Sequence, residues 1–205
     1  MNYTTDDIKK LRDQTGAGMM DAKKALSESD SFDDAVTFLR KKGHASLAKK
    51  SGRVAKEGII TSYIHAGSKV GVLLELNCET DFVARNEEFK ILAQEIALHV
   101  AAASPLFVNR QDVPANTIDN EKQIYAEQMS AKGGSASGGK APPAHLQEQI
   151  MTGKLEKYYE QVCLLDQPYV REPEKKIKDL VAEKVGKLGE NIQVRRFTRF
   201  VLGAE

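Results

Sequence analysis

The sequence predicts an α+β protein, with a small helical head followed by an antiparallel sheet that helices cover. Three observations lead to this prediction. The first 43 residues combine helix caps, glycine breaks and apolar residues at helical spacing. From residue 57 the pattern changes to alternating apolar and β-branched residues, which is typical of a hairpin. A helix with an apolar stripe follows, and neither this helix nor the hairpin buries an apolar face alone.

The predicted head, residues 1–43, contains three short helices and resembles a ubiquitin-associated domain. Thr4 or Thr5 can cap the first helix, which reaches Gln14 and is broken by the glycines that follow. The second helix is expected at Met19 to Ser27. Ser31 can cap the third, and Gly43 stands where a C-terminal cap glycine belongs.

A basic linker is predicted at residues 44–56. It continues a run without acidic residues: Arg40, Lys41, Lys42, Lys49, Lys50, Arg53 and Lys56. RNA contact is one interpretation, but a solvated linker face is favoured, because no aromatic residues are interleaved and no fold motif supports RNA binding.

Residues 57–205 form the predicted core domain. A hairpin is expected at Ile59–Ile64 and Val70–Leu76, joined by a turn at Ala66-Gly67-Ser68. Asn86 can cap the next helix, which ends near Ala103, before Pro105. One face of that helix is apolar: Phe89, Leu92, Ala93, Ile96, Val100 and Ala103.

The second half of the core domain is predicted to contain helices and one long strand. We expect helices at 115–131, 144–164 and 174–188, with a Gly/Ser/Pro-rich flexible loop at 132–143. The last strand covers Ile192 to Leu202. Its apolar phase shifts near Arg195-Arg196, which predicts a bulge.

Composition and motifs exclude several functional classes. The net charge of +1 selects neither nucleic acid nor an anionic membrane, and no apolar run approaches the ~20 residues of a membrane span. The start of the chain lacks a secretory signal, and two cysteines form neither a disulfide framework nor a zinc cage, so we expect a cytoplasmic protein without metal. No phosphate loop, dinucleotide fingerprint, nucleophile elbow or HExxH pair is present, so we predict no enzyme activity and no cofactor.

Two segments carry a specific resemblance. The first runs from Leu11 to Leu26 and reads LRDQTGAGMMDAKKAL, and the second runs from Leu74 to Asn86 and reads LELNCETDFVARN. Together they resemble the signature regions of elongation factor Ts, and the end of the chain, Gly189 to Phe197, is similar to the last core strand of that family. The order and spacing agree from residue 4 to 202. Long family members carry a duplicated core half and a coiled-coil insertion, whereas this chain resembles the short form with a single core.

The resemblance implies a partner, the GTPase elongation factor Tu, and a function: guanine nucleotide exchange without covalent chemistry. It also implies a release wedge at Thr80, Asp81, Phe82 and Val83, a tip between a strand and a helix where exposure is expected. The phenylalanine would enter an apolar pocket of the GTPase near its magnesium ion, with the aspartate near a helix N-terminus of that partner. The alternative is that Phe82 folds back onto Phe89 as a staple.

The resemblance also implies that the head docks on the GTPase through Leu11, Arg12, Met19 and Met20. Adjacent methionines cannot both face one small core, and a soft apolar patch suits an adaptable interface. The alternatives are one buried and one incidentally exposed methionine, and a merely solvated Arg12. His99 lies at the edge of its helix stripe; it is either a satisfied core-edge histidine or a secondary partner contact.

Two rival functions remain open from sequence. A ubiquitin-binding module would fit the head but leave the Thr80–Phe82 tip unexplained. An RNA-binding accessory factor would fit the basic run and predicts affinity that falls steeply with salt. We also expect a homodimer, because the long apolar final strand is an edge that invites pairing with another sheet. The alternative is a monomer whose edge is covered by the helix at 174–188.

Overall fold

The computed structural model describes residues 3–136 and 143–204. The chain divides into two compact units, one made of Met1–Ser104 and Tyr169–Glu205 and the other of Pro105–Pro168. The first unit holds the helical head and a three-stranded antiparallel sheet with helices, so the predicted α+β class is confirmed. These units divide the chain differently from the predicted domains 1–43, 44–56 and 57–205. The functional division into a docking head, a linker and a core domain stays a prediction.

The head begins with three helices: α1 (Thr5–Thr15), α2 (Met19–Ser27) and α3 (Phe32–Lys50). The caps are those expected. The Thr4 side chain accepts the Asp7 N–H in a capping box, and Ser31 accepts the Asp34 N–H. The three helices enclose a small core of Leu11, Ala22, Ala25, Leu26 and Ala35.

The predicted end of the third helix at Gly43 is wrong, and α3 continues through it to Lys50. The physical reason is a contact with a residue far along the chain. A Cβ at Gly43 would lie 3.2 Å from the carbonyl oxygen of Ala182, so the glycine permits close crossing with a second helix. The basic residues 44–50 therefore belong to a helix and not to a linker.

The crossing partner of α3 is α8 (Ile177–Leu188), which follows a short sheet of β3 (Pro168–Tyr169) and β4 (Glu172–Lys176). This helix starts three residues later than predicted, because 174–176 are extended. At the crossing, His44 Nε2 lies 2.7 Å from Asp179 Oδ1. The Asp179 carboxylate also accepts the Lys176 N–H, so one buried side chain fixes the start of α8 and its contact with α3.

The main sheet has the order β1-β2-β5, with all neighbours antiparallel: β1 (Glu57–Ile64), β2 (Val70–Cys78) and β5 (Gln193–Val201). The hairpin and the final strand are thus confirmed. The register of β5 against β2 shifts between Glu75 and Leu76, whose partners are Arg196 and Val194. Arg195 is the extra residue, which confirms the predicted bulge.

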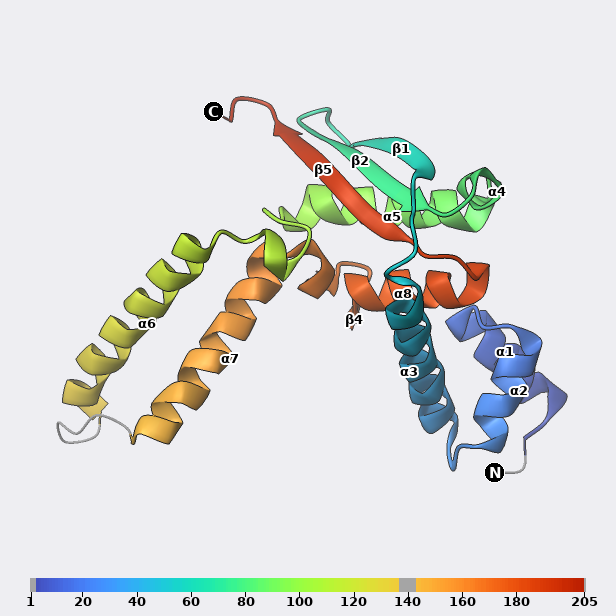
Figure 1. The fold of residues 1–205 in the computed structure, drawn as a ribbon, viewed down its shortest axis with the longest axis horizontal. Helices are drawn as coiled ribbons and strands as arrows, with labels where there is room; N and C mark the ends of the chain where they lie inside the picture. The colour runs from blue at the N-terminus through green and yellow to red at the C-terminus, as the bar shows by residue number, and fades with distance from the viewer. Residues whose placement is uncertain (1–2, 137–142, 205) are drawn as a thin grey trace. The chain divides into compact units, whose positions relative to one another are not determined.

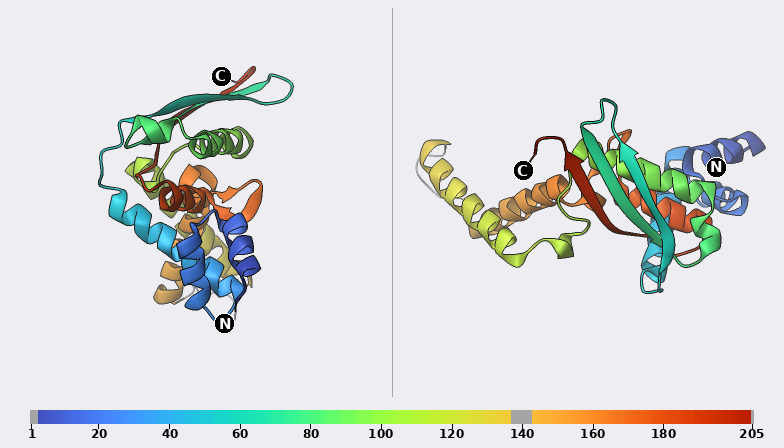
Figure 2. Two further views of the ribbon diagram at one scale, coloured as in Figure 1. Left: turned by 90° about the vertical axis from the view of Figure 1, so that its right-hand side faces the viewer. Right: turned by 90° about the horizontal axis from the view of Figure 1, so that it is seen from above.

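One face of the sheet is covered by α5 (Glu87–Ala103), capped by Asn86 as predicted. The short helix α4 (Asp81–Ala84) lies between β2 and α5. Figures 1 and 2 show the sheet, then α5, then α8 as successive layers. Lys184 and Lys187 of α8 both pair with Glu88, which ties the last two layers together.

The second unit is a pair of helices with short connections. It contains η1 (Arg110–Asp112), α6 (Ala115–Ala136), α7 (Ala144–Val162) and η2 (Leu164–Asp166), and α6 packs against α7. Arg110 joins their bases by donating to Glu156 and Asp166 at 2.7 Å. The expected flexible loop 132–143 is wrong for 132–136, which continue α6, and residues 137–142 lie outside the described residues. Sequence reasoning had not placed these helices in a separate unit.

Within residues 3–136 and 143–204, no helix combines the length and apolar character needed to cross a membrane.

Candidate functional site

The tip at Thr80–Val83 presents an aromatic ring to solvent. The tip consists of Thr80, which is the N-cap of α4, and the first three residues of this single helical turn. Phe82 lies on this turn and is 81% exposed, whereas Phe89 is fully buried. The alternative in which Phe82 folds onto Phe89 is therefore wrong. Val83 is half-buried, and its N–H points to the Thr80 hydroxyl at 3.5 Å. Only one large apolar group of the tip thus projects outward.

The backbone before Phe82 is held by residues that sequence reasoning missed. The Glu190 carboxylate accepts the N–H groups of Glu79 and Thr80, both at 3.0 Å, and the Thr80 hydroxyl at 2.6 Å. In return, Glu79 accepts the Asn191 N–H at 2.7 Å. The only signal in the sequence is the polar Gly189-Glu190-Asn191 segment, which the family resemblance includes with the last core strand.

A buried thiol completes the support of the tip. Cys78 Sγ donates to the Thr80 carbonyl oxygen at 3.2 Å. Burial raises the pKa of Cys78 to about 11, and the negative charge of Glu190 adds to this shift. The thiol therefore stays protonated at neutral pH and keeps its proton for this hydrogen bond. Thr80 is held at its N–H, its hydroxyl and its carbonyl.

Asp81 opens α4 and pairs with a residue one turn later. Arg85 lies 2.9 Å from its carboxylate, and both side chains are largely exposed. An exposed pair of this kind contributes little to stability, so either charge can exchange its partner at low cost.

The second exposed apolar region is on the head. Met19 and Met20 form the first turn of α2 and are 58% and 75% exposed. The alternative with one buried methionine is therefore wrong. Arg12 is also exposed, near the end of α1.

Two of the predicted contact residues are buried. Leu11 is fully buried in the head core, and His99 is fully buried on α5, where its Nδ1 lies 3.3 Å from the Val170 N–H. Neither side chain reaches the surface in this conformation. For His99 this favours the satisfied core histidine over the secondary contact, and Leu11 supports the head from inside.

The chain is similar to known proteins over nearly its whole length. The family profile described as "Elongation factor TS" matches residues 9–204. Elongation factor Ts of Thermodesulfovibrio yellowstonii is 55% identical over 204 residues, which cover 99% of this chain and 98% of the relative. The chain belongs to the elongation factor Ts family. The protein of the same name from Thermotoga neapolitana is 52% identical over the whole of both chains, and that of Carboxydothermus hydrogenoformans is 48% identical over 98% of this chain and 89% of the relative.

The two segments that carry the family resemblance, Leu11–Leu26 and Leu74–Asn86, contain the two exposed regions. As a member of the elongation factor Ts family the protein acts in translation elongation. Among the residues that the structure describes, no group of three or more His, Cys, Asp or Glu is placed to hold a metal ion.

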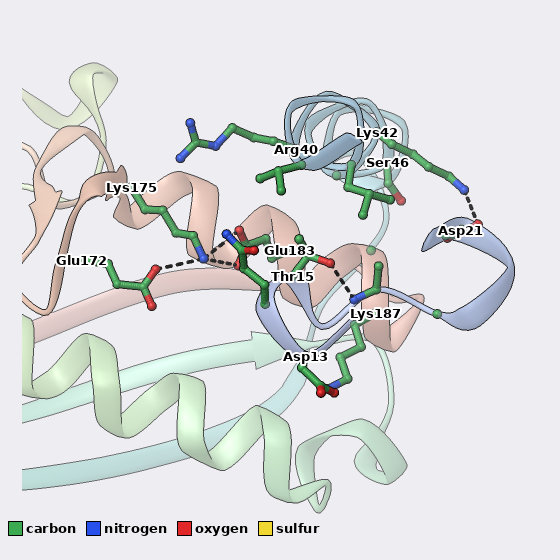
Figure 3. A pocket seen from close by; sticks show the side chains of 17 residues that line it. Asp13, Thr15, Asp21, Arg40, Lys42, Ser46, Glu172, Lys175, Glu183 and Lys187 are labelled. Carbon is green, nitrogen blue, oxygen red and sulfur yellow. Dashed lines mark hydrogen bonds and ion pairs between the residues drawn. The ribbon is translucent and has the colours of Figure 1, made fainter. Parts of the chain in front are cut away.

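A cavity of about 460 Å³ lies between the α1–α2 turn, α3 and α8 (Figure 3). Several of its charged groups pair with each other: Lys42 with Asp21 at 2.5 Å, and Lys175 with Glu183 at 3.2 Å. Burial raises the pKa of Glu183, an effect that Lys175 opposes. Neither the methionines nor Phe82 line this cavity, although Gly18 and Asp21, which flank the two methionines in the sequence, do.

Proposed function

We propose that this protein is a guanine nucleotide exchange factor that binds elongation factor Tu and promotes release of GDP, without covalent chemistry. The observation that carries the proposal is the exposure of Phe82, which is 81%. The ring lies on a turn whose N-cap backbone is held by a hydrogen bond from the Thr80 N–H to Glu190. Because most of the ring lies in water, it contributes little to the stability of this fold. Its burial becomes favourable when an apolar pocket of a partner takes it up.

The two exposed regions suggest a division of work. Met19 and Met20, with Arg12 nearby, would grip the GTPase, since unbranched thioether side chains adapt to an uneven surface. Phe82 would enter between two helices of the GTPase near the magnesium ion, as the family resemblance implies. Movement of those helices would weaken the magnesium and phosphate contacts, and GDP would leave faster.

Exchange of this kind is a shift of populations. The factor must bind the nucleotide-free GTPase better than the nucleotide-bound form, because equal affinity for both would shift nothing. Linkage makes the effect reciprocal, so GDP or GTP also lowers the affinity of the factor. The GTPase in its nucleotide-free and GDP forms is therefore the proposed partner, in the cytoplasm, and we expect neither nucleic acid nor membrane to take its place.

The direct test is release of labelled GDP from elongation factor Tu, with and without sub-stoichiometric amounts of this chain. We expect release to accelerate with concentration and to saturate. Unchanged release over a wide concentration range would remove the proposal. Equal release by a heat-denatured sample would show that the folded protein is not required.

We also propose a homodimer, and the supporting observation concerns the open face of the sheet. One face packs on α5, and the opposite face presents exposed apolar side chains at positions that alternate with the inner ones: Ile60, Ile64, Leu73 and Phe200, with exposed Leu202 directly after β5. An apolar face of this kind is typical of an interaction surface. A second copy would cover it symmetrically. The edge of β5, the last strand in the order β1-β2-β5, stays a second surface on which two copies would pair.

Light scattering at micromolar concentration tests the dimer. We expect twice the chain mass of 22.6 kDa, and Phe200→Asp should reduce it to the single chain, because a buried unpaired charge is costly. Val54→Asp, at an exposed apolar residue outside the sheet, is the matched control and should leave the dimer intact. A wild-type mass of 22.6 kDa that does not change with concentration would rule the dimer out.

A further inference from the structure

The Glu190 carboxylate is the main support of the tip. Its Oε2 atom accepts two neighbouring backbone N–H groups, those of Glu79 and Thr80, and its Oε1 atom accepts the Thr80 hydroxyl. Hydrogen bonds to an ionised acceptor are stronger than neutral ones. These three leave the backbone between the end of β2 and the start of α4 little freedom to rotate.

The support is reciprocal. Glu79 Oε1 accepts the backbone N–H of Asn191 at 2.7 Å and lies 3.4 Å from the Arg53 guanidinium. The Asn191 amide donates to the Arg53 carbonyl at 2.8 Å, and Asn191 is fully buried. Each of the two segments, 79–80 and 190–191, therefore places a carboxylate on the backbone of the other. Displacement of one segment breaks hydrogen bonds in both directions.

The same support connects the tip to the head. Glu190 directly follows Gly189, the left-handed cap at the end of α8 with φ of 80°. Through the close crossing at Gly43, α8 packs on α3, and α1 and α2 pack on α3 in turn. A path through two packed helices, α8 and α3, therefore joins the residues that present Phe82 to those that present Met19 and Met20.

We propose that Glu190 is a positioning residue for nucleotide exchange, which holds Thr80 so that Phe82 projects at a fixed place relative to the docked head. This inference rests on the proposed exchange function. Glu190 itself need not contact the GTPase. Its effect comes from preorganisation, because a tip that is already ordered loses less conformational entropy when it enters the partner.

The test uses the full chain and labelled GDP bound to elongation factor Tu. Glu190→Ala should lower the release rate at saturation by about tenfold, since misplacement of a working group by about 1 Å is enough for an effect of this size. The concentration for half-saturation should change by less than about twofold, because the head still docks. Glu190→Gln should recover most of the rate, because its carbonyl oxygen can still accept both N–H groups.

Two comparisons separate this role from a general loss of stability. In a Phe82→Ala background, Glu190→Ala should cause no further loss of rate, since a residue that acts through another is not additive with it. Asp112→Ala is a matched control, because it removes a carboxylate that accepts a backbone N–H at 2.8 Å in the other unit. That variant should exchange GDP as the wild type does.

Several results would overturn the inference while leaving the exchange function intact. These are a wild-type rate in Glu190→Ala, a loss confined to half-saturation, a loss that adds fully to that of Phe82→Ala, and a Glu190→Gln variant as impaired as alanine. An inert wild-type protein would instead remove the exchange function itself.

Discussion

The head and the tip both expose apolar side chains, but the chain supports them in opposite ways. Met19 and Met20 are flexible side chains on a helix of a small separate core, and their backbone is an ordinary first turn. Phe82 is a stiff ring on a single turn, and the residue two positions before it is held at three atoms. Flexible methionine side chains can adapt to an uneven partner surface. A ring on a fixed backbone is suited to moving the helices of the partner between which it inserts. The difference indicates that docking and opening are separate tasks.

The largest expected effect is on the head. Leu11→Ala should destabilise the protein by about 2–5 kcal/mol, because Leu11 and Leu26 are the only large side chains among the described buried residues of the head core cluster. Exchange should then require far more protein while the saturating rate is kept. Denaturant unfolding and a GDP-release titration measure the two effects, and Val54→Ala, at an exposed site, is the control. A stable Leu11→Ala variant with poor docking would restore Leu11 as a direct contact.

The tip should respond in the reverse manner. Phe82→Ala should lower the saturating rate by roughly 30-fold, since loss of a buried aromatic anchor typically costs ~2 kcal/mol. Its melting temperature should equal that of the wild type, because the ring is 81% exposed in the free protein. A clear fall in the melting temperature would mean that the ring belongs to this fold.

The double variant Met19→Ala with Met20→Ala sharpens the comparison on the docking side. We expect about a tenfold rise in the concentration for half-saturation, equivalent to ~1.4 kcal/mol, with little change in the saturating rate. The same GDP-release titration reports both quantities. Normal half-saturation with a much lower maximal rate would contradict the division of tasks.

The smallest effect concerns the joint between α5 and α8. Hydrogen bonds from Lys184 and then Lys187 lower the pKa of Glu88 to about 2, from 4.5. A lowered pKa in the folded state stabilises the fold above 4.5, and this contribution is lost as the pH falls towards 2. Because the pair is partly exposed, we expect only ~0.5–1 kcal/mol from it.

Glu88→Gln should therefore be less stable than the wild type at pH 7 and equal to it near the lowered pKa. Urea unfolding at several pH values measures this. Glu87→Gln, at the neighbouring and largely exposed position, is the control and should show a smaller pH-dependent difference. A Glu88→Gln variant whose difference from the wild type persists unchanged at about pH 2 would contradict the assigned cause.

The sequence predicted features that depend on near neighbours. Thr4, Ser31 and Asn86 cap helices by bonds to residues two or three positions away, and the shifted phase at Arg195 revealed the bulge. Gly43 was misread because the reason for a glycine there is the carbonyl of Ala182, far along the chain.

In the candidate site, too, the features that depend on distant residues could not be predicted from the sequence. The tip could be found because its exposed phenylalanine stands in a turn-like segment with a family resemblance. Glu190 could not, because its partner Thr80 is 110 positions away and a glutamate after a helix is ordinary in sequence. Leu11 shares a segment with the exposed methionines, and only the packing of the head separates a core residue from surface residues.

The most direct test of separate docking and opening is competition between wild type and Phe82→Ala. Release of labelled GDP from elongation factor Tu is measured at a fixed amount of wild-type protein and increasing amounts of the variant. If the head docks without the ring, the variant should occupy the GTPase and lower the rate towards its own slow value. A rate that stays at the wild-type level in large excess of Phe82→Ala would show that docking requires the ring, and would contradict the account.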